Sequence, residues 1–350
     1  MKNTPLSQHL YRWGLILLCV VIAGFCYSYM NEFYDPLARY KYATDENRGI
    51  ILDYLDSSDI DYIINQHLRP EIFLPFIEAP GFAIHNAVLY KTAQDTQKAD
   101  TDFIVNFVNR YRGYFSAAQL KELLKNYSYD DLINFYETQT VLYDGIRLVE
   151  DPSAPLVILG PDDSVYKYVP DKLADYHGIQ VREEMLTDLD DMLGAYALTM
   201  DKEQTMELKN GYLSYEDLLN DYADRFEIFG DDAELLGGSG GRNEEQLGYT
   251  VVFAGNQDWL NLLEEHPEWL NEDHYDELEE ELSADRRREL TWLENKAWRY
   301  GFVIRYPKGK ESVTGQLWQP FKLRYVGREN ARELHLRQST LEQAKLSTLN

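Results

Sequence analysis

The sequence has very little cysteine: two residues, Cys19 and Cys26, among 350. Both lie inside one apolar run, so no disulfide can form in the rest of the chain, which excludes a small secreted fold held together by disulfides. Basic residues are also scarce, with 34 Lys and Arg against 60 Asp and Glu and a formal net charge of −26. A surface this acidic repels nucleic acids and other polyanions, so a nucleic-acid-binding role is excluded.

Only one long apolar run is present, at residues 13–30, and it carries no charged side chain. Its length is just sufficient to cross a bilayer as a helix, and Lys2 and Arg12 precede it. The positive flank predicts a cytoplasmic N-terminus at residues 1–12, a transmembrane anchor at 13–30 and an extracytoplasmic remainder, that is, a single-pass membrane protein. The alternative is a cleaved signal peptide, although Cys26 and Ser28 make a poor cleavage site.

After a juxtamembrane connector at residues 31–48, the pattern over residues 49–139 predicts an all-α domain. Apolar residues recur at spacings of three and four, as in Ile60, Ile63 and Ile64, and Pro70 stands at a first helical position. The same pattern returns at a constant offset of sixty residues. We interpret it as two copies of a helix-turn-helix unit that bury their apolar faces against each other.

The sequence pattern changes at residue 140, and residues 140–350 predict a domain that contains both helices and strands. Short runs rich in β-formers at 141–149 and 156–159 predict strands, and 182–199 predicts a helix. Two further runs, 301–306 and 323–326, predict a pair of strands near the C-terminus. The sequence contains no phosphate-binding loop.

The last of these strands lies in a motif that resembles a known family. Residues 319–327 read Gln-Pro-Phe-Lys-Leu-Arg-Tyr-Val-Gly. This resembles the Glu-Pro-Trp-His-Leu-Arg-Tyr-Val-Gly motif of the VanY-like D-alanyl-D-alanine carboxypeptidases, which are zinc enzymes of bacterial peptidoglycan. The resemblance implies that Gln319 stands at the position of the general base and Lys322 at that of a zinc-binding histidine.

Two upstream segments carry the same resemblance. Residues 241–252 are similar to the family's Gly-x-Ser-Glu-His-Gln-Thr-Gly-Leu-Ala-Val-Asp, and they place Glu245 and Val252 where the family has its other two zinc ligands. Residues 211–216, Gly-Tyr-Leu-Ser-Tyr-Glu, resemble Gly-Tyr-Arg-Ser-Tyr-Glu, whose Arg binds the substrate carboxylate. The resemblance implies that the remaining substrate-cleft positions are Tyr212, Leu213, Ser214, Asn243, Gln246 and Arg324.

The chemistry of a zinc hydrolase requires three metal ligands and a carboxylate that takes a proton from water. Val252 cannot coordinate a metal, Lys322 would first have to lose its proton, and Gln319 cannot act as a base. We therefore expect no metal, no other cofactor and no catalytic residue. We hypothesise that Lys322 and Glu245 form an ion pair in the former metal site with Val252 beside it; alternatively, both side chains point to solvent.

The resemblance implies an α+β fold over residues 140–350, with a small antiparallel sheet flanked by helices, preceded by the all-α segment and the transmembrane helix. Taken with the exchanged ligand positions and the apolar run, it predicts a membrane-anchored, catalytically inactive carboxypeptidase-like protein that binds peptidoglycan stem peptides or a cell-wall partner protein. One alternative is an active D,D-carboxypeptidase that trims terminal D-Ala through a rearranged site. Another places the partner surface on the helical segment. Fold alone does not choose among them.

Overall fold

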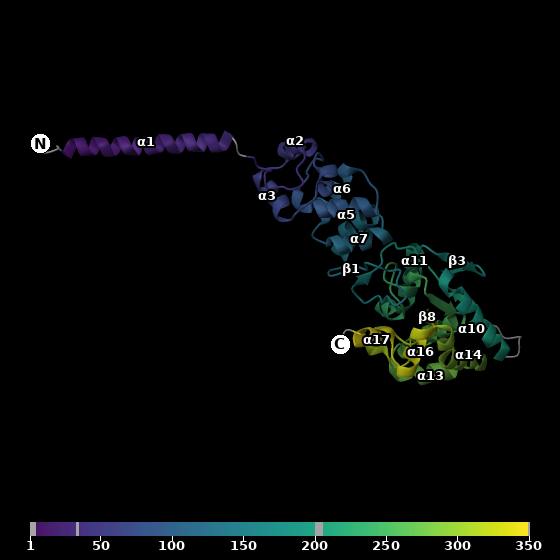
Figure 1. The fold of residues 1–350 in the computed structure, drawn as a ribbon. Coiled ribbons are helices and arrows are strands. Elements are labelled where there is room, and N and C mark those ends of the chain that lie inside the picture. The colour runs from purple at the N-terminus through teal and green to yellow at the C-terminus, as the bar shows by residue number, and fades with distance from the viewer. Residues whose placement is uncertain (1–4, 33–34, 200–205, 349–350) are drawn as a thin grey trace. The chain divides into compact units, whose positions relative to one another are not determined.

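The computed structural model describes residues 5–32, 35–199 and 206–348 of the chain. The chain divides into two compact units, Met1–Leu120 and Lys121–Asn350 (Figure 1). The division thus falls nineteen residues before the boundary expected at 139/140, inside helix α7 (Ala117–Asn126). Of the predicted N-terminal segments, residues 1–4 and 33–34 lie outside the described residues.

Helix α1 (Pro5–Glu32) opens the first unit. Its stretch Leu10–Met30 has a mean hydropathy of 2.0 and is long and apolar enough to cross a membrane. The described side chains of this stretch are all exposed, so the protein itself provides no core for them. An apolar helix at this position fits either a membrane anchor or a signal sequence.

The rest of the first unit is helical, as predicted. Its elements are α2 (Asp45–Tyr54), α3 (Ser57–Asn65), α4 (Pro70–Phe73), η1 (Leu74–Phe76), η2 (Ile84–Asn86), α5 (Ala87–Thr96) and α6 (Thr101–Tyr111). Asp56 caps α3 by accepting hydrogen bonds from two backbone N–H groups, and Pro70 begins α4 as predicted.

The first copy of the proposed helix-turn-helix repeat buries its apolar face within its own part of the chain. Ile60 and Ile63 are buried in a cluster whose members all lie between Leu37 and Ala87. The packing of the two copies against each other stays a prediction. Amphipathic helices repeat the same spacing whatever they pack on, so a shared offset does not by itself identify the partner.

The second unit contains small sheets among many helices. Its helices are α8 (Tyr129–Asn134), the π-turn η3 (Phe135–Gln139), α9 (Thr140–Leu142), η4 (Glu183–Met185), α10 (Leu186–Thr199), α11 (Tyr215–Phe229), η5 (Gly230–Leu236), η6 (Glu244–Leu247), α12 (Gly255–Glu265), η7 (Pro267–Trp269), η8 (Glu272–His274), α13 (Tyr275–Glu281), α14 (Ala284–Lys296), η9 (Ala297–Tyr300), α15 (Glu311–Thr314), α16 (Arg328–Arg337) and α17 (Leu341–Thr348). Its strands are β1 (Arg147–Leu148), β2 (Asp163–Ser164), β3 (Leu173–Tyr176), β4 (Ile179–Arg182), β5 (Leu208–Asn210), β6 (Thr250–Phe253), β7 (Phe302–Tyr306) and β8 (Gln319–Tyr325).

The largest sheet has the strand order β5-β6-β8-β7, with every pair antiparallel. The strand pair predicted near the C-terminus is confirmed as β7 and β8. One face of this sheet packs on a large core that includes Leu189 and Met192 of α10 and Phe321 and Leu323 of β8. This α+β architecture, with a small antiparallel sheet among helices, agrees with the expected fold class.

The strands predicted at 141–149 and 156–159 are largely wrong. Val141 and Leu142 lie in α9, which continues directly from the π-turn, and their side chains are 78% and 70% exposed. Only Arg147 and Leu148 pair as a strand, and residues 156–159 form a turn and extended segment without strand pairing. Strand propensity is realised only where a partner strand and a buried face exist, and neither is present around Val141.

Candidate functional site

A pocket of about 350 Å³ opens in the second unit between the large sheet and helices α11 and α12. Strands β5, β6 and β8 supply one side of it. Its lining residues are Lys209, Asn210, Asp221, Arg225, Leu236, Glu245, Val252, Phe253, Asn256, Gln257, Trp259, Leu260, Gln319 and Lys322. All four positions at which the sequence predicts exchanged ligands and base, Glu245, Val252, Gln319 and Lys322, belong to this lining.

Local backbone structure places Glu245 at the pocket. Asn243 caps the short helix η6, because its Oδ1 accepts a hydrogen bond from the Glu245 backbone N–H at 3.0 Å. Gly248 ends η6 with φ +76°, a left-handed conformation that favours glycine, and the chain then turns directly into β6. Glu245 and Val252 are thereby held on either side of one tight turn.

Lys322 and Glu245 form a buried ion pair. The distance from Lys322 Nζ to Glu245 Oε1 is 3.0 Å, and each side chain is only 7% exposed. The hypothesis that these two groups form an ion pair is confirmed, and the alternative that both point to solvent is wrong. Burial removes water from both charged groups, and the contact between ammonium and carboxylate offsets part of that cost. Either charge buried without the other would be strongly destabilising.

Sheet register explains why the other two positions meet this pair. Val252 on β6 lies directly opposite Lys322 on β8. Between β7 and β8 the register shifts, because Ile304 and Tyr306 face Leu323 and Gln319 respectively. Strand β8 thus bulges between Gln319 and Leu323, and a bulge re-aims side chains, so that Gln319 and Lys322 both line the pocket although they are three residues apart.

These residues do not fit a zinc ion. Val252 offers no donor atom, and the Lys322 ammonium is engaged with Glu245. In the described part of the chain, no group of three or more His, Cys, Asp or Glu side chains is arranged to hold a metal. His266 and His274 lie at the surface, as expected from their charged surroundings, each within 4 Å of a neighbouring Glu.

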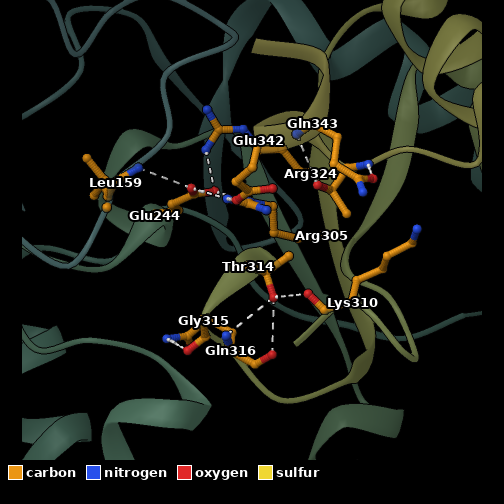
Figure 2. Close-up of polar contacts among 12 residues, drawn as sticks. Leu159, Glu244, Arg305, Lys310, Thr314, Gly315, Gln316, Arg324, Glu342 and Gln343 are labelled. Carbon is orange, nitrogen blue, oxygen red and sulfur yellow. Dashed lines mark hydrogen bonds and ion pairs between the residues drawn. The ribbon is translucent and has the colours of Figure 1, made fainter. Parts of the chain in front are cut away.

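The residue before Glu245 anchors the whole segment to the sheet. Glu244 accepts two hydrogen bonds from Arg305, at 2.6 and 2.7 Å, and lies 3.2 Å from Arg324 Nη1 (Figure 2). Arg305 also contacts Glu342 of α17 at 2.6 Å. Burial alone would raise the pKa of Glu244, but the combined attraction of Arg305 and Arg324 outweighs it and lowers that pKa. Glu244 therefore stays ionised in the core and fixes η6 to β7 and β8.

Sequence comparison identifies the framework around this pocket. Residues 180–328 match the family model described as "VanY: D-alanyl-D-alanine carboxypeptidase". These residues form a VanY-family domain. The pocket and the ion pair lie entirely within it.

Several proteins resemble parts of the chain. A D-alanyl-D-alanine carboxypeptidase of Enterococcus faecium is 46% identical over 43 residues, which are 12% of this chain and 14% of that protein. The chain thus matches well under two thirds of the length of such relatives. Among solved structures, the LdcB LD-carboxypeptidase has a TM-score of 0.43 at 24% identity, covering 57% of this chain and 90% of that one. VanYB in complex with D-alanine-D-alanine has a TM-score of 0.42 at 19% identity, covering 54% and 96%.

Not every predicted cleft residue of the VanY-family domain reaches the pocket. Gln246 is fully buried elsewhere, where its amide donates to the backbone oxygens of Tyr166 and Tyr168. Arg324 is also fully buried, and it binds Glu244 and the backbone oxygens of Pro155 and Val157. These two side chains donate hydrogen bonds to buried backbone oxygens. Their predicted position at a substrate cleft is therefore corrected, because in the structure they lie in the core.

The other four predicted cleft residues are likewise absent from the described pocket lining. Asn243 is buried and serves as the η6 cap, with its Nδ2 donating to Gly238 O at 3.2 Å. Ser214 caps α11 in a capping box with Asp217. Tyr212 donates its backbone N–H to Gln180 O, and Leu213 is half-buried beside it. Leu213 therefore contributes no side chain to the lining of this pocket.

Sequence reasoning missed the residues that α11 and α12 of the VanY-family domain contribute to the pocket lining. Asp221 and Arg225 stand four apart on α11 with Arg225 Nη2 3.1 Å from Asp221 Oδ2. That spacing signals a helical ion pair, but not the face on which it lies. Partial removal from water raises the pKa of Asp221, and the nearby Glu245 carboxylate acts in the same direction.

Proposed function

We propose that the VanY-family domain binds peptidoglycan stem peptides without cleaving them, on the outer side of a membrane in which helix α1 anchors the chain. The observation that carries this proposal is the ion pair between Lys322 and Glu245, 3.0 Å apart and buried, at the positions where the family resemblance expects zinc ligands. An ammonium group there repels a divalent cation. Val252 and Gln319 complete a pocket wall that offers neither a third ligand nor a base.

Retention of a pocket supports binding. Its volume, about 350 Å³, is in the range of small-ligand sites, and its lining mixes apolar surface with a few polar groups. The family description names D-alanyl-D-alanine, which is the end of a peptidoglycan stem peptide. A peptide of that kind is therefore the first ligand to test.

The orientation of the anchor follows from charge. Lys2 and Arg12 precede the uncharged run at residues 13–30, and acidic residues follow it. Positive flanks remain on the cytoplasmic side, which places the VanY-family domain outside, where peptidoglycan lies.

The test uses the full chain in detergent micelles and a pentapeptide ending in D-alanyl-D-alanine. Calorimetry measures binding, and chromatography measures release of D-alanine with and without added zinc. We expect saturable binding with no release in either condition. Zinc-dependent release would establish the active carboxypeptidase instead. A failure to bind any stem peptide would favour a protein partner.

A further inference from the structure

The same pocket contains buried hydrogen-bond donors that the protein leaves unused. Arg225 is 8% exposed and donates one hydrogen bond, from Nη1 to Gly237 O at 3.0 Å. Its Nη2 forms an ion pair with Asp221 Oδ2 at 3.1 Å, and its Nε has no acceptor among the residues that the structure describes. A buried guanidinium with a free donor is costly, and such a group calls for a partner.

Two neighbours on the pocket wall are in the same condition. Gln319 and Trp259 are each 1% exposed, and within the described ranges neither the Gln319 amide nitrogen nor the Trp259 indole nitrogen has an acceptor. Arg and Trp side chains only donate hydrogen bonds. The chemical group that complements several unpaired donors in one pocket lining is an acceptor with two oxygens and a negative charge, which is a carboxylate.

The charge of the lining agrees with this assignment. The lining has three cationic residues, Lys209, Arg225 and Lys322, and two anionic ones, Asp221 and Glu245, and Lys209 also pairs at 2.6 Å with Glu207 outside the lining. The pocket is therefore not acidic, unlike the chain as a whole with its net charge of −26. The Asp221 side chain is 49% exposed. It can therefore turn toward water and leave the Arg225 fork to an incoming carboxylate.

We infer that Arg225 receives the terminal carboxylate of a peptide ligand, with Gln319 and Trp259 as additional donors. This inference rests on the proposed function and deepens it. Arg225 enters the pocket from α11, the helix that begins just after Leu213, where the family resemblance expects the carboxylate-binding Arg. The unpaired Asn256 Oδ1 on the same wall suits a peptide N–H, which favours a peptide end over a simple organic acid.

The experiment compares D-alanyl-D-alanine with its C-terminal amide by calorimetry on the full chain in micelles. The unmodified protein should bind the amide at least tenfold more weakly, since a hydrogen bond to a charged group typically changes affinity by roughly tenfold to a hundredfold. In Arg225→Met the two ligands should bind equally, and Arg225→Lys should recover only part of the difference because it lacks the fork. Arg147→Met, an exposed cation outside the pocket, is the matched control and should preserve the full difference.

Each outcome has a defined meaning. Equal binding of acid and amide by the unmodified protein would overturn the carboxylate assignment and leave the proposed function standing. Binding of neither would count against both. Acetate or free D-alanine binding as tightly as the dipeptide would overturn the assignment of a peptide end. Because the acid–amide comparison needs no mutation, it stays decisive even where Arg225→Met fails to fold.

Discussion

Val252 and Lys322 occupy directly opposed positions on β6 and β8, so two residues at which the family resemblance expects metal ligands face each other across one strand pair. Cross-strand neighbours of this kind have Cβ atoms roughly 5 Å apart, close enough to share a metal if their chemistry allowed it. The expected frame is thus present with side chains that do not fit zinc. Four predictions follow from this frame, from the buried charges around it and from helix α1.

The first prediction concerns restoration of metal binding. The combined variant Glu245→His, Val252→Asp, Lys322→His and Gln319→Glu should bind zinc with a stoichiometry of about one, because it supplies three ligands and a base on an existing frame. Zinc content measured by mass spectrometry after dialysis tests this. The unmodified protein, treated in parallel, should retain almost none, and one tightly held zinc per unmodified chain would contradict the account of the site given above.

The second prediction concerns the ion pair. Lys322→Met leaves the Glu245 carboxylate buried without a partner, which should lower the free energy of unfolding by about 3–5 kcal/mol. Adding Glu245→Gln to that variant should recover much of the loss, because the uncompensated charge disappears. Urea unfolding followed by fluorescence measures both. Lys209→Met, whose side chain is 50% exposed, is the control and should change stability by less than about 0.5 kcal/mol.

The third prediction is a pH dependence that arises from Glu244. Its pKa is lowered in the folded protein by Arg305 and Arg324 against the effect of burial. A carboxyl with a lowered folded pKa contributes stability above its unfolded pKa, roughly 4.3, and that contribution is lost as pH falls through the lower folded value. The unfolding free energies of the unmodified protein and of Glu244→Gln should therefore differ at pH 7 and converge below about pH 4. A gap that stays constant through this range would contradict the assignment.

The fourth prediction concerns the apolar helix. In cells, the full chain should remain with the membrane fraction after a carbonate wash, and a chain lacking residues 1–32 should not. Under the proposed orientation, protease added to intact spheroplasts should degrade the VanY-family domain. Recovery of the protein in the medium with a shortened N-terminus would instead establish a cleaved signal sequence.

Local sequence patterns predicted the structure correctly where residues close together in the sequence determine it. A long uncharged run predicts the helix that contains Leu10–Met30, and turn residues between two β-rich runs predict the pairing of β7 with β8. The Glu245–Lys322 contact could also be predicted from the sequence, because the resemblance aligned both residues with positions that must meet around one metal. Complementary charges at such positions can be expected to pair.

Only the tertiary structure decided which side chains from distant parts of the chain are buried together and which groups they contact there. Gln246 and Arg324 have the residue types of ligand-binding groups, yet they lie in the core because backbone oxygens around Tyr166 and Pro155 need donors there. Conversely, Arg225 looks like an ordinary helical partner of Asp221 until folding brings it into the same pocket as Gln319, ninety-four positions away. Composition and spacing report which groups a chain carries; only the packed fold determines which of them lose water and which remain free to bind.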